Sequence, residues 1–214
     1  MISIALDGPA GAGKSTVAKG AAKALGFIYV DTGALYRTVG LKFLREGYDT
    51  KLNCNVESVL EKISVDIKFK EGTQHVFLNG EDVSEQIRTP EASMMASAVS
   101  AKPEVRAFLL DMQRRLAREN NVIMDGRDIG TVVLPDATLK FFVTASVDER
   151  AMRRYKELKQ KGMDVNFDDI YKDIETRDYN DSHREIAPLK PAADSLMFDT
   201  TGTTLEESIE KLIK

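Results

Sequence analysis

The feature that most constrains this chain is a glycine-rich stretch near its start, GPAGAGKS at residues 8–15. It matches the pattern G-x-x-x-x-G-K-[ST] at every position, and it stands between an apolar run, Ile2–Leu6, and an alanine-rich stretch, Lys14–Leu25. A strand, a glycine-rich turn and a helix in this order form the context in which the pattern cradles phosphates. The alternative is a glycine-rich turn that only starts a helix, and the complete motif favours phosphate binding over it.

The chemistry of phosphate binding explains this spacing. Glycines allow successive backbone N–H groups to turn inward around an anion, and the N-terminus of the following helix adds a favourable dipole. Lys14 supplies a point charge for the β- and γ-phosphates of a nucleotide, and the Ser15 hydroxyl is suited to ligate Mg²⁺. We therefore expect ATP to bind, with Mg²⁺ at Ser15, on the following residues: Gly8, Pro9, Ala10, Gly11, Ala12, Gly13, Lys14, Ser15 and Thr16.

Short apolar runs separated by helical patterns predict an α/β fold around a parallel sheet. The expected strands are Ile2–Leu6, Phe27–Val30, Val122–Met124, Leu139–Val143 and Ser195–Phe198. The expected helices include Lys14–Leu25, Pro103–Glu119, Asp148–Lys161, Asp168–Arg184 and a last helix that follows a capping box of Thr204 and Glu207. Several strands end in Asp or Thr, and the carboxyl ends of parallel strands are where open α/β sheets place their ligands.

The stretch Val65–Ile87 breaks this alternation of strands and helices. Apolar residues alternate with polar ones in residues 67–69 and again in residues 76–78, which is typical of strands. Asn79-Gly80, directly after the second run, is typical of a tight hairpin turn. We expect a small antiparallel sheet inserted among helices.

Composition bounds the possible classes of function. Of the 214 residues 43% are apolar, enough for one compact domain, and the formal net charge of −4 argues against a dedicated nucleic-acid binder. The single cysteine, Cys54, rules out an internal disulfide and fits a reducing compartment. The start of the chain lacks the basic region of a signal peptide, and no apolar run approaches the roughly 20 residues of a membrane span. We expect a cytoplasmic monomer that binds neither nucleic acid nor membranes.

Two further motifs follow predicted strands and are candidates for binding a second substrate. In DTGALYR, residues 31–37, Arg37 has the fork geometry that suits a phosphate and Thr32 offers a hydroxyl group. The alternative is that Thr32 caps a helix and Arg37 is solvated. In DGRDIG, residues 125–130, two carboxylates flank Arg127, and a structural ion pair is the alternative to a binding site.

Two predicted helices each place three charged side chains on one face. The first set is Arg150, Arg153 and Arg154, and the second is Arg177, Asp181 and Arg184. Clustered like charges in the first set favour an anion as their partner, although a solvated basic face is the alternative. For the second set the alternative to a binding site is a surface ladder of ion pairs, which contributes little to stability.

Over essentially its whole length the chain resembles the bacterial cytidylate kinase family. The resemblance is carried by four motifs in this order: DGPAGAGKS, DTGALYR, DGRDIGTVV and APLKPAAD. The first motif is shared by many nucleotide-binding proteins, whereas the other three together are specific to this family. The resemblance implies the adenylate-kinase-like fold of P-loop kinases, in which a five-stranded parallel core sheet is flanked by helices.

The resemblance also implies how one nucleoside monophosphate kinase domain, residues 1–214, is organised. The core would comprise about residues 1–31, 120–147 and 185–214. The acceptor-binding region would comprise about residues 32–119, with the β insertion at about 65–87. Residues 148–184 would form a lid that closes over the phosphates.

The family's functional residues map onto matching positions of this sequence. Arg37 and Arg127 match the arginines that hold the acceptor phosphate, and Thr32 matches a position near that phosphate that is often Ser. The cytosine ring would be read by Ser97, Arg106 and Asp128. The pentose and the rest of the acceptor pocket would be contacted by Arg177, Asp181 and Arg184. The catalytic charges would come from Lys14, Arg153 and Arg154.

The activity implied by the resemblance is ATP + CMP = ADP + CDP, with dCMP as a second acceptor. No residue is expected to act as an obligatory base, since a phosphate oxygen is already largely deprotonated near neutral pH. Two rival functions remain open at this point. One is a kinase for another small acceptor, such as UMP or a metabolite that is not a nucleotide, and the other is a P-loop switch or an ATPase that depends on nucleic acid.

Overall fold

The computed structural model describes all residues, 1–214, and contains the predicted α/β architecture. Five strands form one sheet in the order β2-β6-β1-β7-β8. They are β1 (Ser3–Asp7), β2 (Ile28–Asp31), β6 (Val122–Gly126), β7 (Leu139–Thr144) and β8 (Leu196–Asp199). Each predicted strand is therefore confirmed, with ends shifted by one or two residues. None of the helices is long and apolar enough to cross a membrane.

Contacts between Cα atoms divide the chain into two compact units. The first unit contains Met1 and residues 28–122, and the second contains residues 2–27 and 123–214.

The first unit combines helices with the inserted sheet. Its helices are α2 (Thr32–Arg45), α3 (Val56–Leu60), α4 (Pro90–Ser100), α5 (Pro103–Glu119) and a 3₁₀ helix (Gln86–Arg88). Its strands β3 (Val65–Lys70), β4 (Thr73–Leu78) and β5 (Glu81–Asp82) form an antiparallel sheet. The predicted hairpin turn is confirmed between β4 and β5, where Asn79 and Gly80 have positive φ angles of 51° and 83°.

The inserted sheet is held in place by the core of the first unit. The register pairs Val65 with Leu78, so the apolar residues of both strands share one face. These buried side chains pack in one cluster with Leu35 and Val39 of α2. Because α2 also carries Arg37, the sheet supports the helix from which that side chain extends.

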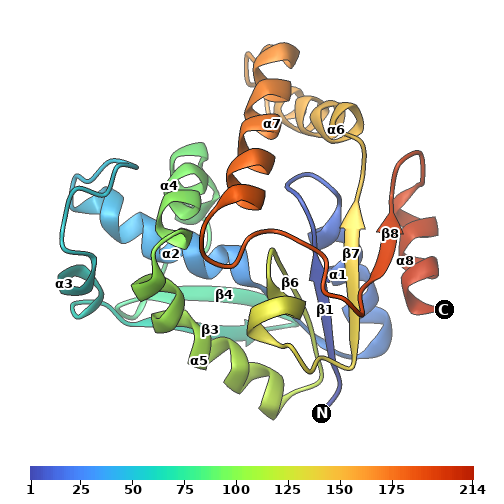
Figure 1. The fold of residues 1–214 in the computed structure, drawn as a ribbon, viewed down its shortest axis with the longest axis horizontal. Coiled ribbons are helices and arrows are strands. Elements are labelled where there is room, and N and C mark those ends of the chain that lie inside the picture. Colours follow the sequence, from blue (N-terminus) through green and yellow to red (C-terminus); the bar gives the residue numbers. More distant parts are fainter. The chain divides into compact units, whose positions relative to one another are not determined.

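The second unit contains the phosphate-loop motif. Strands β1 and β7 are parallel, as are β7 and β8. The helices are α1 (Lys14–Leu25), α6 (Val147–Gln160), α7 (Phe167–His183) and α8 (Leu205–Ile213). Figure 1 shows α6 and α7 next to each other, and Ala151, Leu158, Ile170 and Ile174 form a small apolar core within this pair.

Local capping explains where the helices of the second unit begin and end. Gly26 adopts a left-handed conformation after α1, with φ of 69°, and donates its N–H to the Ala22 carbonyl. The predicted capping box is confirmed, because the Thr204 and Glu207 side chains each accept a backbone N–H of the other residue. Asn166 caps α7, so this helix begins one residue earlier than predicted.

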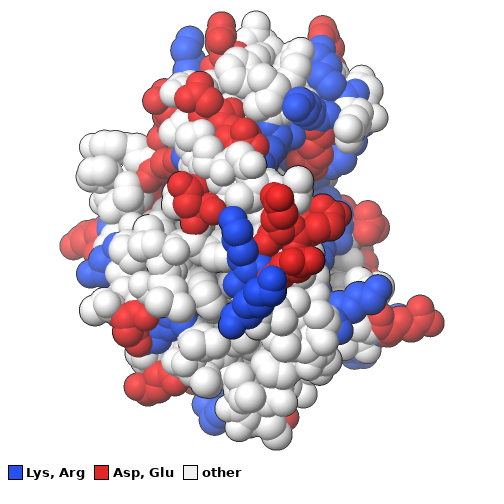
Figure 2. All heavy atoms as spheres, turned by 90° about the vertical axis from the view of Figure 1, so that its right-hand side faces the viewer, with Lys and Arg blue, Asp and Glu red and all other residues white.

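Basic and acidic side chains are interspersed on the face of the molecule drawn in Figure 2. Elsewhere in the chain some charged side chains are paired one helical turn apart, as in Lys42–Glu46 and Lys161–Glu157. Such pairs contribute little to stability. Figure 2 shows no broad basic surface on the face that it draws.

Candidate active site

The phosphate-loop motif forms a tight turn between β1 and α1. Gly8 has a φ of 146°, and a Cβ atom at this position would lie 1.9 Å from the carbonyl oxygen of Val143, so only glycine fits. Helix α1 starts at Lys14, which places the N-terminus of the helix at the end of the loop. The Lys14 ammonium group donates to the carbonyl of Pro9 at 2.7 Å, across the loop. The loop thus combines a helix N-terminus with a positive charge, the two features that attract a phosphate.

The Lys14 ammonium group is buried beside charges of both signs. Its exposed fraction is 6%. Burial, followed by repulsion from Arg127, lowers the pKa of Lys14 to about 7, while the nearby carboxylates of Asp125 and Asp7 oppose the shift. A bound polyphosphate would add negative charge next to Lys14 and favour the protonated lysine.

Two side chains with oxygen atoms that could bind a metal ion meet at the start of α1. The Ser15 hydroxyl donates to the Asp125 carboxylate at 2.7 Å. A hydroxyl and a carboxylate are ligand types that Mg²⁺ accepts, usually together with water and substrate phosphates. These residues therefore fit the ion expected at Ser15. The sequence analysis considered Asp125 only as part of the DGRDIG motif, a candidate for binding the second substrate. Its hydrogen bond with Ser15 shows that it also contacts the phosphate loop.

The Asp7 carboxylate, at the end of β1, holds the turn that follows the DGRD motif. It accepts the backbone N–H groups of Ile129 and Gly130, both at 2.7 Å. Those residues begin a single π-helical turn, Ile129–Val133. Burial raises the pKa of Asp7 to about 6, against the lowering effect of the two backbone hydrogen bonds. Asp7 thereby links the strand before the phosphate loop to the turn that directly follows Arg127 and Asp128.

Two ion pairs connect the DGRD motif to helix α7 and the residue after it. The Arg127 guanidinium group donates to Asp181 at 2.8 Å, and the Arg184 guanidinium group lies 3.5 Å from Asp128. Asp128 and Asp181 are buried, so the predicted alternative of a surface ladder is wrong for these pairs. Arg177 lies one turn before Asp181 on the same helix and is partly buried. Charged side chains thus join the DGRD motif to the C-terminal end of α7.

The DTGALYR motif forms the start of α2 in the first unit. Asp31 rather than Thr32 caps the helix, since its carboxylate accepts the N–H of Ala34 at 3.0 Å. The other carboxylate oxygen pairs with Arg37 at 2.8 Å, and Thr32 is buried. The predicted alternative, in which Thr32 is the cap and Arg37 is solvated, is therefore wrong in both respects.

Ser97 and Arg106 lie on either side of the connection between α4 and α5. The Ser100 hydroxyl donates to the carbonyl of Ser97, and Arg106 donates to the carbonyl of Ser100 at 3.3 Å. Arg106 is buried, and its guanidinium carbon lies 5.7 Å from the centre of the Tyr36 ring. The structure thus brings Arg106 next to the helix that carries Arg37.

The three arginines of α6 have three different environments. Arg150 is buried and donates to the carbonyls of Ala10 and Ala145 and to the carboxylate of Asp178. The anion that partners Arg150 is therefore the Asp178 carboxylate of the protein itself. Arg153 donates to Glu149 and to both oxygens of Thr200. Arg154 pairs with Glu157 and is 42% exposed.

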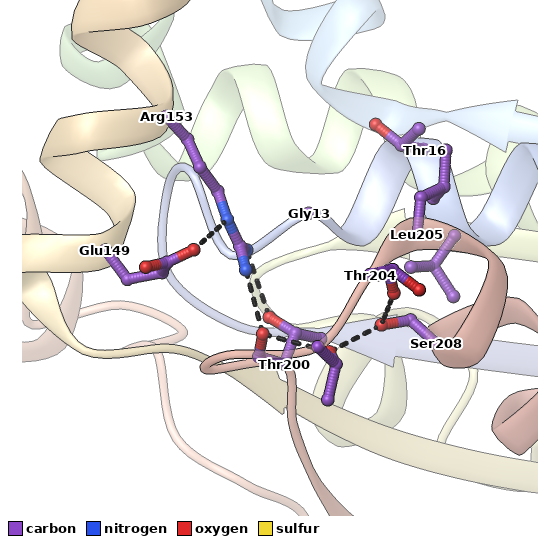
Figure 3. Close-up of a pocket in the computed structure, with 10 residues that line it drawn as sticks. Gly13, Thr16, Glu149, Arg153, Thr200, Thr204, Leu205 and Ser208 are labelled. Carbon is purple, nitrogen blue, oxygen red and sulfur yellow. Dashed lines mark hydrogen bonds and ion pairs between the residues drawn. The ribbon is translucent and has the colours of Figure 1, made fainter.

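A pocket of about 200 Å³ lies beside the phosphate loop. Figure 3 shows Arg153 and Glu149 on one side of it and Thr204, Leu205 and Ser208 on the other, with Gly13 of the loop between the two groups. Thr16 of α1 lies next to Leu205, and Thr200 contacts Arg153. The Thr200 hydroxyl also donates to the carbonyl of Ala12 in the loop at 3.1 Å. Sequence analysis missed these threonines, although the run DTTGTT after the last strand is a polar, glycine-containing loop of the kind that binds ligands.

Comparison with known proteins identifies the family. The model of a family described as cytidylate kinase matches residues 4–214. The chain belongs to the cytidylate kinase family. A cytidylate kinase of Caldicellulosiruptor bescii is 51% identical over 213 residues, which cover 100% of this chain and 94% of the relative. A cytidylate kinase of Streptococcus pyogenes serotype M5 is 51% identical over 210 residues, which cover 98% of this chain and 93% of the relative.

Structural similarity adds information on the fold alone. A solved structure of an uncharacterized protein from Eubacterium ventriosum has a TM-score of 0.54 to this chain at 11% sequence identity. The match covers 100% of this chain and 96% of the other. This structural match agrees with the α/β fold of the chain.

The acceptor residues expected from the family pattern form separate sets in the two units. Thr32, Arg37, Ser97 and Arg106 belong to the first unit, and Arg127, Asp128, Arg177, Asp181 and Arg184 belong to the second. Within the second unit the structure brings four of its five members together as ion pairs. Within the first unit Thr32 and Arg37 share the first turns of α2, whereas Ser97 lies on α4 and Arg106 on α5.

Proposed function

We propose that this protein transfers the γ-phosphoryl group of ATP to CMP, and also to dCMP, giving ADP and the cytidine diphosphate. The observation that carries this proposal is the match to the cytidylate kinase family over residues 4–214. A phosphate loop that ends at the buried Lys14 supports the donor half of the reaction.

The donor nucleotide would occupy the phosphate loop and the pocket beside it. The triphosphate would lie against the backbone N–H groups of the loop and Lys14, with Mg²⁺ held by Ser15 and Asp125. The base of the same nucleotide would occupy the pocket lined by Arg153 and the Thr200 region, because this pocket adjoins Gly13. When bound, Mg²⁺ would neutralise charge on the β- and γ-phosphates.

The acceptor nucleotide would be held by arginines at its phosphate and by polar groups at its base. Arg37 and Arg127 would bind the phosphate, near Thr32, and each is held by a carboxylate in this structure. Asp128 accepts hydrogen bonds only and suits the N4 amine of cytosine. Arg106 donates only and suits N3 or O2 of the same ring.

The remaining acceptor residues would complete the pocket. Ser97 would contact the ring through a hydroxyl that both donates and accepts. Arg177 and Asp181 would lie near the pentose, and Arg184 would join the acceptor pocket beside Asp128.

Transfer requires alignment and charge neutralisation more than covalent help from the protein. An oxygen of the acceptor phosphate attacks the γ-phosphorus, and the bond from that phosphorus to the bridging oxygen of ADP breaks. Lys14, Arg153 and Arg154 would stabilise the charge that spreads over the transferring group. Helices α6 and α7, about residues 148–184, would act as the lid that excludes water and prevents futile hydrolysis of ATP. We further propose that the protein works as a cytoplasmic monomer.

A panel of acceptors tests the function directly. Purified protein is incubated with ATP, Mg²⁺ and either CMP, dCMP, UMP, AMP or shikimate, and ADP formation is measured. We expect the highest kcat/KM with CMP and substantial activity with dCMP. Faster turnover of another acceptor would replace the substrate assignment, and ATP hydrolysis that depends on added DNA or RNA would favour the rival ATPase function.

A further inference from the structure

The amide side chain of Gln74 makes an unusual contact for a residue of the inserted sheet. Gln74 lies on β4, and its side-chain oxygen accepts the backbone N–H of Asp31 at 2.9 Å. Its side-chain nitrogen donates to the carbonyl of the same residue at 3.2 Å. One amide group therefore pairs with both backbone polar groups of a residue 43 positions away. The partners also determine the orientation of the amide, because an N–H must face oxygen and a carbonyl must face the NH₂ group.

Asp31 is the point at which β2 ends and α2 begins. One of its carboxylate oxygens caps α2 by accepting the N–H of Ala34, and the other pairs with Arg37 at 2.8 Å. The orientation of the Asp31 side chain depends on the orientation of its backbone. Gln74 fixes that backbone through hydrogen bonds to both its N–H and its carbonyl group. A continuous series of contacts thus leads from Gln74 through Asp31 to the guanidinium group of Arg37.

We propose that Gln74 is a positioning residue that sets the geometry of Arg37 for binding the acceptor phosphate. The proposal rests on the proposed function, since Arg37 is assigned there to that phosphate. It also gives the inserted sheet a role in substrate binding, through a residue that does not itself touch the substrate. A bidentate contact with a phosphate tolerates little displacement of the arginine, so a shift at Asp31 is transmitted to the affinity for the acceptor.

Two variants of Gln74 and one matched control test this proposal. Gln74→Ala removes both hydrogen bonds, and Gln74→Leu removes them while keeping most of the side-chain volume. Gln86→Ala is the control, because Gln86 belongs to the same unit but bonds only to the exposed side chains of Arg45 and Glu81. We expect both Gln74 variants to raise the KM for CMP about fivefold, the effect of losing one or two ordinary hydrogen bonds. The KM for ATP should not change, and Gln86→Ala should behave like the wild type.

A double-mutant cycle with Arg37→Lys separates positioning from a general loss of stability. Lysine keeps the positive charge but cannot form the two-pronged contact, so its position matters less. In the Arg37→Lys background, Gln74→Leu should therefore change the KM for CMP by less than about twofold. The same fivefold effect in both backgrounds, or an unchanged KM in the Gln74 variants, would overturn the proposal. Absence of CMP phosphorylation by the wild type would instead contradict the proposed function, so the two failures are distinguishable.

Discussion

At the scale of single residues, Lys14 combines burial with a charge directed into the phosphate loop. We expect Lys14→Ala to lower kcat by about a hundredfold or more, as removal of one preorganised charge-stabilising group commonly does. The variant should stay folded, since the native hydrogen bond from Lys14 goes to one carbonyl within the loop. Circular dichroism beside steady-state rates makes the comparison. Near-normal turnover by a folded Lys14→Ala protein would contradict the assignment of the loop.

Asp128 has two candidate roles, a partner for Arg184 and a reader of the base. Uracil carries an acceptor where cytosine carries the N4 amine, so a carboxylate rejects uracil and an amide tolerates it. We expect Asp128→Asn to narrow the preference for CMP over UMP in kcat/KM by about tenfold or more, mainly through lost activity with CMP.

The control for this variant is Arg184→Gln, which breaks the same ion pair and leaves the Asp128 carboxylate in place. The kcat/KM ratio for CMP and UMP should stay close to that of the wild type in this control. An unchanged ratio in Asp128→Asn would mean that Asp128 is structural and that another residue reads the base.

At the scale of elements, the three arginines of α6 have different surroundings: the interior of the protein, the pocket beside the phosphate loop and the partly exposed surface. Arg150 joins the helix to the phosphate loop through Ala10, so it contributes to the shape of the loop. Arg153 lines the pocket next to Gly13, where a Cβ atom would lie 3.5 Å from its guanidinium group. Arg154 is the most exposed of the three, and its partner is Glu157.

We expect replacement of both Arg153 and Arg154 by Ala to lower kcat more than it weakens binding of CMP. The reason is that both residues are assigned to the donor phosphates and to the lid, and neither is assigned to the acceptor. Of the single variants, Arg153→Ala should also raise the KM for ATP, because it removes one wall of the pocket. Isothermal titration with CMP beside steady-state rates provides the measurement. Loss of CMP affinity with kcat preserved would place these arginines in the acceptor pocket instead.

At the scale of the whole molecule, the buried ammonium group of Lys14 couples folding to pH. Its pKa is about 7 in the folded protein and near 10.5 in the unfolded chain, so between these values the unfolded chain binds more protons. The free energy of unfolding must then rise with pH across this window. We expect wild-type protein without nucleotide to gain on the order of 1–2 kcal/mol between pH 7 and pH 9 relative to Lys14→Ala. Urea unfolding of both proteins at the two pH values measures this difference, and equal pH dependence would show that Lys14 titrates normally.

Much of the fold was predictable because its signals are local in the sequence. The phosphate-loop motif, the Asn79-Gly80 turn and the capping box at Thr204 each depend on residues within a few positions of one another, and each appears as predicted. The strands were predictable for a related reason, since burial on both faces requires a continuous apolar run. Fold class and the nucleotide-binding loop were thus determined by the sequence alone.

The partners of the charged side chains were decided only by the tertiary structure. Helical spacing indicates that Arg150 and Arg153 share a face, but not that Asp178 and Thr200 would be their respective partners. The same holds for Gln74 at Asp31 and for Thr200 at Ala12, which are 43 and 188 positions apart. Periodicity records which residues face the same direction, whereas a hydrogen bond depends on which distant backbone the folded chain brings within about 3 Å. That choice is made by the packing of the whole core, and no local pattern contains it.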